Sequence, residues 1–215
     1  MFAVREPMIY SPQRIRNATE NSCIGENTNI NELSDEQVLN GINEYAKQIK
    51  FEPLDNALFC TINGKTGSFL GNLISPTTNK RNDRWGGNLE NRMRASYHIV
   101  NRVRELIKND LVIEFHISGA EYIKDGYTVE EGIRIAKALE DKVDIIYVSA
   151  GIDLRKDGFV KRMSDMGIEH GCNLKLASEI KKHISIPVAT TGGLGDARMM
   201  NAIIASGKVD YLYSV

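Results

Sequence analysis

The middle of the chain contains the long polar segment Ser75-Pro76-Thr77-Thr78-Asn79-Lys80-Arg81-Asn82-Asp83-Arg84-Trp85-Gly86-Gly87-Asn88-Leu89-Glu90-Asn91-Arg92. It is too polar and too rich in turn formers for a strand. Pro76 fixes φ, and Gly86 and Gly87 permit positive φ. An apolar, strand-like run precedes the stretch, and a helical pattern follows it. In a (β/α) protein a long loop between a strand and a helix carries the chemistry, so we expect a functional loop here.

The charges of this loop have a second interpretation. The loop contains charged residues of both signs, which can tie it down by ion pairs: Arg81, Asp83, Arg84, Glu90 and Arg92. A solvated loop pinned by its own charges is therefore the alternative to a functional one. Asn88 stands where the next helix needs an N-cap.

Strands and helices alternate along the rest of the chain. Short apolar runs predict strands at 57–62, 111–117, 144–149, 186–191 and 210–214. Helical spacing predicts helices at 34–50, 89–108, 128–140, 173–183 and 196–206. Strict alternation is typical of a parallel α/β fold. The sequence thus predicts five strands, whereas a closed barrel of this kind has eight.

Several helix ends are marked by their residues. Ser34 with Gln37, and Thr128 with Glu131, have the spacing of a capping box. Asp196 is expected to cap the last helix, and Gly207 to follow its end. Residues 1–33 are irregular and read as a connector or lid, which leaves 34–215 as the folded domain.

Composition excludes several functional classes. The chain has 215 residues with 42% hydrophobic and 26% charged residues, which is ordinary globular composition. A net charge of −1 argues against nucleic-acid or anionic-membrane binding. No apolar run reaches membrane-spanning length. The cysteines, Cys23, Cys60 and Cys172, are odd in number and far apart, so we expect free thiols in the cytoplasm.

The central stretch reads S-P-x-x-N-x-R-x-D-x-W-G-G-x-x-x-N-R. It resembles the loop after the fourth barrel strand in the old yellow enzyme family of FMN-dependent NAD(P)H oxidoreductases. The similarity is greatest to the branch of 2,4-dienoyl-CoA reductases and bacterial enoate reductases, and it extends from about Leu33 to the end. The resemblance implies a partial (β/α)8 TIM barrel, strands 4–8 with their helices, in which the first three strands are missing.

The same resemblance implies a function. NADH or NADPH reduces FMN, and hydride passes from the flavin to an activated alkene, an enone or an enoyl thioester. With five strands we expect weak or no activity from the chain alone. A complementary chain or a homo-oligomer would cover the sheet edges. The alternative is a non-catalytic remnant that acts as a partner-bound or structural module.

A glycine turn is the best candidate site from the residues themselves. Thr190-Thr191-Gly192-Gly193-Leu194-Gly195-Asp196 joins a strand to a helix, where backbone N–H groups can bind an anion. A plain tight turn is the alternative. By resemblance, Gly192 and Gly193, with Thr191 beside them, match the contact to the FMN phosphate. The family's second phosphate contact, a Gly-Arg pair, would fall just beyond Val215.

The resemblance also assigns four substituted positions. His116 stands where the family carries an Arg beside the flavin; a strand histidine satisfied by its neighbours is the alternative. Asn63 and Thr66 align with the pair that polarises the substrate carbonyl, and Ser68 with the proton-donating Tyr. Ser is a far weaker acid than Tyr, so a polar loop without catalytic duty is the alternative.

Two remaining pairs of residues give weaker indications of function. His170 and Cys172 lack the further partners of a zinc site, so no metal is expected, and we predict a loop leading to an N-cap at Asn173. A barrel lyase or isomerase would need a Lys or carboxylate at a strand end. Glu114 and Lys65 are the candidates for that reaction, and no motif surrounds either.

Overall fold

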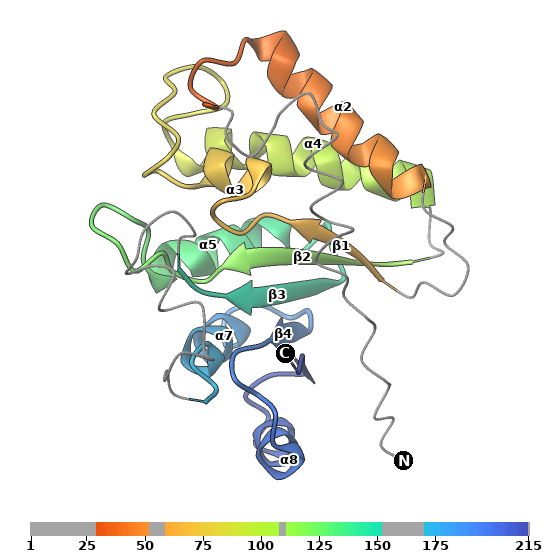
Figure 1. Ribbon diagram of the computed structural model, residues 1–215, viewed down its shortest axis with the longest axis vertical. Coiled ribbons are helices and arrows are strands. Elements are labelled where there is room, and N and C mark those ends of the chain that lie inside the picture. The colour runs from red at the N-terminus through yellow and green to blue at the C-terminus, as the bar shows by residue number, and fades with distance from the viewer. Residues whose placement is uncertain (1–28, 52–58, 108–110, 152–169, 215) are drawn as a thin grey trace.

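The computed structural model describes residues 29–51, 59–107, 111–151 and 170–214 (Figure 1). Helices and strands alternate along nearly all of this part of the chain. In chain order the elements are α2 (Asp35–Phe51), β1 (Phe59–Asn63), α3 (Phe69–Ile74), α4 (Leu89–Ile107), β2 (Val112–Ser118), α5 (Val129–Leu139), β3 (Ile145–Ser149), α7 (Leu174–Lys181), β4 (Val188–Thr190), α8 (Ala197–Ala205) and β5 (Tyr211–Leu212).

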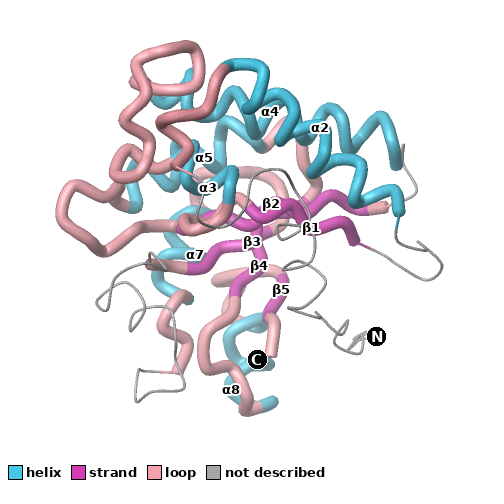
Figure 2. The backbone as a smooth tube through the Cα atoms, turned by 45° about the horizontal axis from the view of Figure 1, so that its top comes forward, coloured by secondary structure: helices cyan, strands magenta, loops and turns pink. Residues whose placement is uncertain are grey.

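The strands form one parallel sheet in the order β1-β2-β3-β4-β5 (Figure 2). Each strand therefore lies beside the one that follows it in sequence. Crossovers between parallel strands are right-handed, so a sheet that always advances in one direction places all its helices on one face. This is the arrangement of a (β/α) barrel wall, and it confirms the five predicted parallel strands.

The two faces of the sheet differ in chemistry. One face packs under the helices and is aliphatic and aromatic, with buried Ile62, Phe115, Ile117 and Val148. The other, the inner face, carries a separate buried cluster of Ile145, Tyr147 and Ala189. Polar side chains lie among these on the inner face. Strands buried on both faces read as continuous apolar runs, which is why alternation was weak in the sequence.

Most predicted helix ends are confirmed. Ser34 and Gln37 form the capping box, with Ser34 N donating to Gln37 Oε1 (2.8 Å) and Gln37 N donating to Ser34 Oγ (3.2 Å). Asn88 Oδ1 accepts from Asn91 N (2.9 Å) at the start of α4.

The second capping box is wrong. Thr128 stands at the N-cap of α5 but makes no side-chain cap bond, because its hydroxyl donates to Glu130. Glu131 pairs with Arg92 instead (2.8 Å). The Glu131 carboxylate, which the capping box needs, is thus engaged in an ion pair with the buried guanidinium of Arg92.

One helix, α3, was not expected from the sequence. α3 occupies six residues between β1 and the long loop, and four of them are buried. It is too short for a periodic pattern. The predicted connector over 1–33 lies outside the described residues except for 29–33, and so does the start of the first predicted strand. In the part of the chain that the structure describes, we find no helix with an apolar segment of membrane-spanning length.

Candidate functional site

The carboxyl ends of parallel strands meet at one edge of the sheet, and the predicted site residues gather there. Asn63 ends β1 and pairs in the ladder with His116 of β2. Thr191, Gly192 and Gly193 follow β4 directly. The structure therefore brings Asn63 and His116 side by side and places the glycine turn two strands away.

His116 is held on the inner face by its neighbours. Its Nε2 lies 2.8 Å from Ser149 Oγ on β3. Its ring stacks on Tyr147, with centroids 3.9 Å apart and planes 20° apart. Only 4% of the residue is exposed. The imidazole is thus fixed in one orientation, beside the last residues of β1 and β3.

Ser68 is a helix cap. Its hydroxyl accepts from Gly71 N (3.0 Å) at the start of α3 and lies within donating distance of two backbone carbonyls, Lys65 O (2.7 Å) and Asn63 O (2.9 Å). The hydroxyl proton is therefore directed into the protein. Thr66 is 2% exposed, and its hydroxyl donates to Glu121 Oε1 (2.7 Å).

Asn63 keeps a hydrogen-bond donor. Its Oδ1 accepts from Lys65 N (3.3 Å), which sets the orientation of the amide. No acceptor within the described residues is paired with its Nδ2. Of the three side chains predicted on this loop, Asn63 alone has a donor that the described protein groups leave open.

The glycine turn accepts no side chain at Gly192. Its φ is +126°, a region that L residues rarely adopt. A Cβ there would lie 2.8 Å from Cys172 Sγ and 3.0 Å from Asn173 Nδ2. Gly193 is also left-handed, with φ of 63°. The turn therefore contains two glycines with positive φ, and the first of them packs closely against Cys172 and Asn173.

The peptide groups of this turn are oriented by their carbonyls. Gly192 O accepts from Gly171 N (2.7 Å), and Gly193 O accepts from His170 Nδ1 (2.6 Å). In a trans peptide the N–H points opposite to the C=O, so the N–H groups of Gly193 and Leu194 point away from the 170–171 segment. Within the described part of the chain neither N–H donates to another backbone group outside the regular elements. Such paired, unengaged donors suit an anion.

The helix that follows does not compete for that anion. Asp196 Oδ1 accepts from Arg198 N (2.7 Å) and Met199 N (3.3 Å), which confirms Asp196 as the cap of α8. Its negative charge occupies the helix N-terminus. An anion would therefore be bound by the turn and not by the end of α8.

Two other segments brace the turn. The Thr191 hydroxyl donates to Tyr213 O (2.9 Å), and Thr191 O accepts from Asn173 Nδ2 (2.9 Å). Asn173 stands at the N-cap of α7 as predicted, but its side chain makes no cap bond because it is engaged with Thr191. The turn is thus tied to the end of β5 and to the start of α7.

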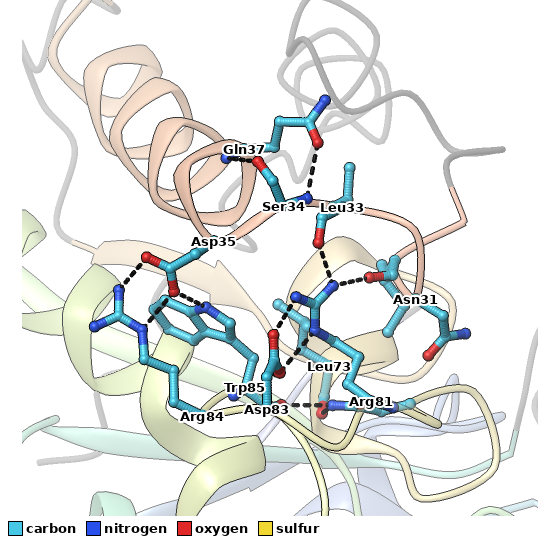
Figure 3. Close-up of polar contacts among 12 residues, drawn as sticks. Asn31, Leu33, Ser34, Asp35, Gln37, Leu73, Arg81, Asp83, Arg84 and Trp85 are labelled. Carbon is cyan, nitrogen blue, oxygen red and sulfur yellow. Dashed lines mark hydrogen bonds and ion pairs between the residues drawn. The ribbon is translucent and has the colours of Figure 1, made fainter.

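The long loop over 75–88 is tied down by charge, which was the alternative to a functional loop (Figure 3). Asp35 accepts from Arg84 Nη2 (2.7 Å) and from Trp85 Nε1 (2.7 Å). Arg81 donates to Leu33 O (2.7 Å) and pairs with Asp83. Trp85 is fully buried. These contacts fasten the loop to the start of α2. The role of these loop residues is therefore structural.

No group of three His, Cys, Asp or Glu side chains that could hold a metal occurs among the described residues. Two further residues near the site, Glu121 and Tyr147, were not expected from the sequence. Glu121 is fully buried in the loop after β2, and Tyr147 supports His116. Neither belongs to a motif. Tyr147 could have been expected at the site from the alternation of side chains along its strand, which places it on the inner face of the sheet.

Comparison with known proteins identifies relatives. The profile of the NADH:flavin oxidoreductase / NADH oxidase family matches residues 6–212. The chain is 38% identical over 152 residues to an NADH oxidase of Thermoanaerobacter brockii, covering 70% of this chain and 23% of that protein. It is 27% identical over 150 residues to an NADPH dehydrogenase of Clostridium acetobutylicum, covering 69% of this chain and 42% of that protein. The chain thus spans less than half the length of either relative.

Solved structures show the same fold. A 2-naphthoyl-CoA reductase superposes with a TM-score of 0.75 at 24% identity, covering 85% of this chain and 28% of that one. The old yellow enzyme homologue of Zymomonas mobilis gives 0.62 at 19% identity, covering 85% of this chain and 49% of that one. With the profile matching nearly its whole length, the chain belongs to the NADH:flavin oxidoreductase / NADH oxidase family.

Proposed function

We propose that this chain forms the C-terminal part of the barrel of an NAD(P)H:flavin oxidoreductase of the old yellow enzyme type. The substrate we propose is an activated alkene, an enone or an enoyl thioester, as in the branch of 2,4-dienoyl-CoA reductases and bacterial enoate reductases. Family membership supports the reaction class. The substrate and the branch rest on the resemblance of the central loop.

The observation that carries the proposal is the glycine turn. We assign Gly192 and Gly193, braced by Thr191, to the FMN phosphate. An anion site is supported by the N–H groups of Gly193 and Leu194, which point away from the 170–171 segment and donate to no other described backbone group outside the regular elements. FMN, when bound, supplies the hydride-transfer chemistry with NADH or NADPH as the reductant. We place His116 against the flavin ring, since it lies on the inner face at the same edge of the sheet.

We assign carbonyl binding to Asn63. Its Nδ2 is a donor at the end of β1, and a donor to the carbonyl oxygen favours charge developing there. The hydroxyls of Thr66 and Ser68 are directed to Glu121 and to backbone carbonyls, so we give these residues a part in holding the loop. Ser68 does not supply the proton that the alkene receives in this proposal.

The test is the visible spectrum of the purified chain. A flavin absorbance that survives gel filtration, with FMN identified by mass spectrometry, supports the proposal. Anaerobic addition of NADH or NADPH should then bleach it, and cyclohex-2-enone should restore it. Absence of flavin after incubation with FMN would contradict the assignment.

A non-catalytic, partner-bound module is the second candidate. The observation that favours it is the engagement of the Ser68 hydroxyl as a helix cap at the position of the family's proton donor. A folded, colourless chain that takes up no FMN would support it. We further propose cytoplasmic location, and a complementary chain or second copy alongside β1 and β5, the outer strands of the sheet. Light scattering on the purified chain tests the last point.

A further inference from the structure

Glu121 is a buried carboxylate that the proposed reaction does not use. It follows β2 by three residues and is 0% exposed. Its Oε1 accepts from Thr66 Oγ1 (2.7 Å), and its Oε2 accepts from Tyr127 N (3.1 Å). Buried carboxylates are rare unless they are paired or hydrogen-bonded. These contacts therefore give the side chain a definite task.

The carboxylate joins two loops that leave neighbouring strands. Thr66 belongs to the loop after β1, and Tyr127 ends the loop after β2. Backbone contacts continue the junction, since Thr66 N donates to Ser118 Oγ (3.2 Å) and Glu121 N donates to Tyr127 O (3.0 Å). Both loops are consequently held to the end of β2 by Glu121 together with Ser118, whose carbonyl also accepts from the Tyr127 hydroxyl (2.6 Å).

The junction is closely packed. A Cβ on Gly126 would lie 2.8 Å from Glu121 Cβ and 3.0 Å from its Oε2. Burial raises the pKa of the Glu121 carboxyl, and hydrogen bonds from Ser75, Thr66 and Tyr127 N, with the charge of Arg92, oppose that rise. Arg92 is itself buried and paired with Glu131. Glu121 is thus surrounded by donors from several separate segments.

Glu121 also decides which groups of the loop after β1 remain available. The single proton of the Thr66 hydroxyl is given to Glu121, so Thr66 can offer only lone pairs elsewhere. The Ser68 hydroxyl is directed to backbone carbonyls. Asn63 Nδ2 remains as the donor, and its place depends on the loop that Glu121 holds.

We propose that Glu121 is a positioning residue of the candidate site, which holds the loop over 63–68 in place and turns the Thr66 proton away from ligand, so that a ligand carbonyl meets the Asn63 amide alone. This inference rests on the proposed function for its ligand. The position of the loop can be measured without one.

The first measurement is amide hydrogen exchange by NMR. In Glu121→Ala the amide of Tyr127 and those over 64–68 should exchange about tenfold faster or more, because their acceptor or anchor is lost. In Thr66→Val only the amides over 64–68 should respond. Glu121→Gln should keep Tyr127 protected, since its Oε1 can accept from Tyr127 N while its NH₂ donates to the Thr66 hydroxyl. Glu114→Gln, a second buried glutamate from β2, is the matched control and should leave all these amides unchanged.

The second measurement is ligand binding to the flavin-loaded protein. Glu121→Ala should weaken cyclohex-2-enone about tenfold, the effect of one misplaced hydrogen bond, while FMN affinity stays within about twofold. Glu121→Gln should recover much of the enone affinity. An equal loss of FMN and enone affinity would mean general loosening and would overturn the inference. So would unchanged exchange over 64–68 in Thr66→Val, whether or not Glu121→Ala folds. If the wild type takes up no FMN, the proposed function fails, and hydrogen exchange alone still decides whether Glu121 holds the loop.

Discussion

The Tyr213 hydroxyl donates to the Glu114 carboxylate across the inner face of the sheet. Glu114 lies on β2 and Tyr213 directly follows β5, with β3 and β4 between them in the sheet order. Tyr147 of β3 fills the space between, with its ring 4.9 Å from that of Tyr213 and nearly perpendicular to it. The sheet is therefore curved enough for strands that are not neighbours to touch, as the wall of a barrel requires.

Tyr213→Phe should destabilise the protein. Among the described residues, it leaves the Thr61 hydroxyl as the remaining side-chain donor to Glu114 (3.0 Å), in a site where Glu114 is only 3% exposed. We expect the free energy of unfolding to fall by about 1.5–3 kcal/mol, as for a lost hydrogen bond to a charged group, measured by urea denaturation. Tyr211→Phe, on an exposed ring of β5, is the control and should leave the midpoint unchanged. Equal changes in the two variants would contradict the role of the bond.

Glu114 should also make stability depend on pH. Burial raises its pKa above the ordinary value of 4.5, against hydrogen bonds from Tyr213 and Thr61. The folded state therefore prefers the protonated carboxyl. The stability that this preference adds is fully present below pH 4.5 and is lost as the pH rises through the raised pKa. Glu114→Gln imitates the protonated form. The stability of the wild type relative to Glu114→Gln should thus fall between acidic and neutral pH, measured by thermal unfolding at several pH values. A difference that is independent of pH, or that grows, would contradict this.

Gly192→Ala should abolish FMN uptake or the fold of the turn. The new Cβ would meet Cys172 Sγ at 2.8 Å in a backbone conformation with φ of +126°. Gly195→Ala is the matched control, because a Cβ at Gly195 meets nothing within 4 Å. We expect Gly195→Ala to bind FMN like the wild type and Gly192→Ala to lose at least about tenfold in affinity, measured by quenching of flavin fluorescence. If Gly192→Ala and Gly195→Ala bind FMN with equal affinity, the assignment of this turn to the FMN phosphate is contradicted.

Arg81→Lys should be costly although it conserves charge. The side chain of Arg81 is 5% exposed and donates to Ile30 O and Leu33 O while it pairs with Asp83. The ammonium group of a lysine cannot donate to these three acceptors at once with the geometry of the planar guanidinium. We expect a loss of about 2–4 kcal/mol in the free energy of unfolding. Arg102→Lys, in an exposed pair with Glu105, should have no measurable effect, and a similar loss there would argue against the explanation.

Cys60 should not react with thiol reagents in the folded protein. It is buried on β1, and burial raises the pKa of its thiol to about 12. At pH 8 the thiolate is therefore scarce as well as inaccessible. Iodoacetamide labelling followed by peptide mass mapping should find Cys60 modified only after denaturation. Half-buried Cys172 should label faster, and the reverse order would contradict the placement of β1.

Periodicity and cap residues were sufficient to predict most of this architecture. The five strands and the helices begin and end within a few residues of their expected positions, because each has either an apolar face or a cap such as Ser34 or Asp196. The failures have local causes. α3 is too short to show a period, and Thr128 lost its partner because Glu131 pairs with Arg92.

The candidate site was less predictable than the fold. Sequence position correctly brought Asn63 and His116 to one edge, since parallel strands share that edge. What the sequence could not supply was the direction of each proton. That Thr66 donates to Glu121 depends on a contact across 55 residues that no local pattern encodes.

The fastening of the 75–88 loop to the start of α2 has a consequence for protein engineering. Asp35 binds Arg84 and Trp85, and the backbone of Leu33 binds Arg81, although these partners stand about fifty positions apart in the chain. A chimaera that receives this loop from a relative must receive the segment around 30–35 from the same parent. Otherwise the guest arginines and tryptophan would face a host surface that lacks their acceptors.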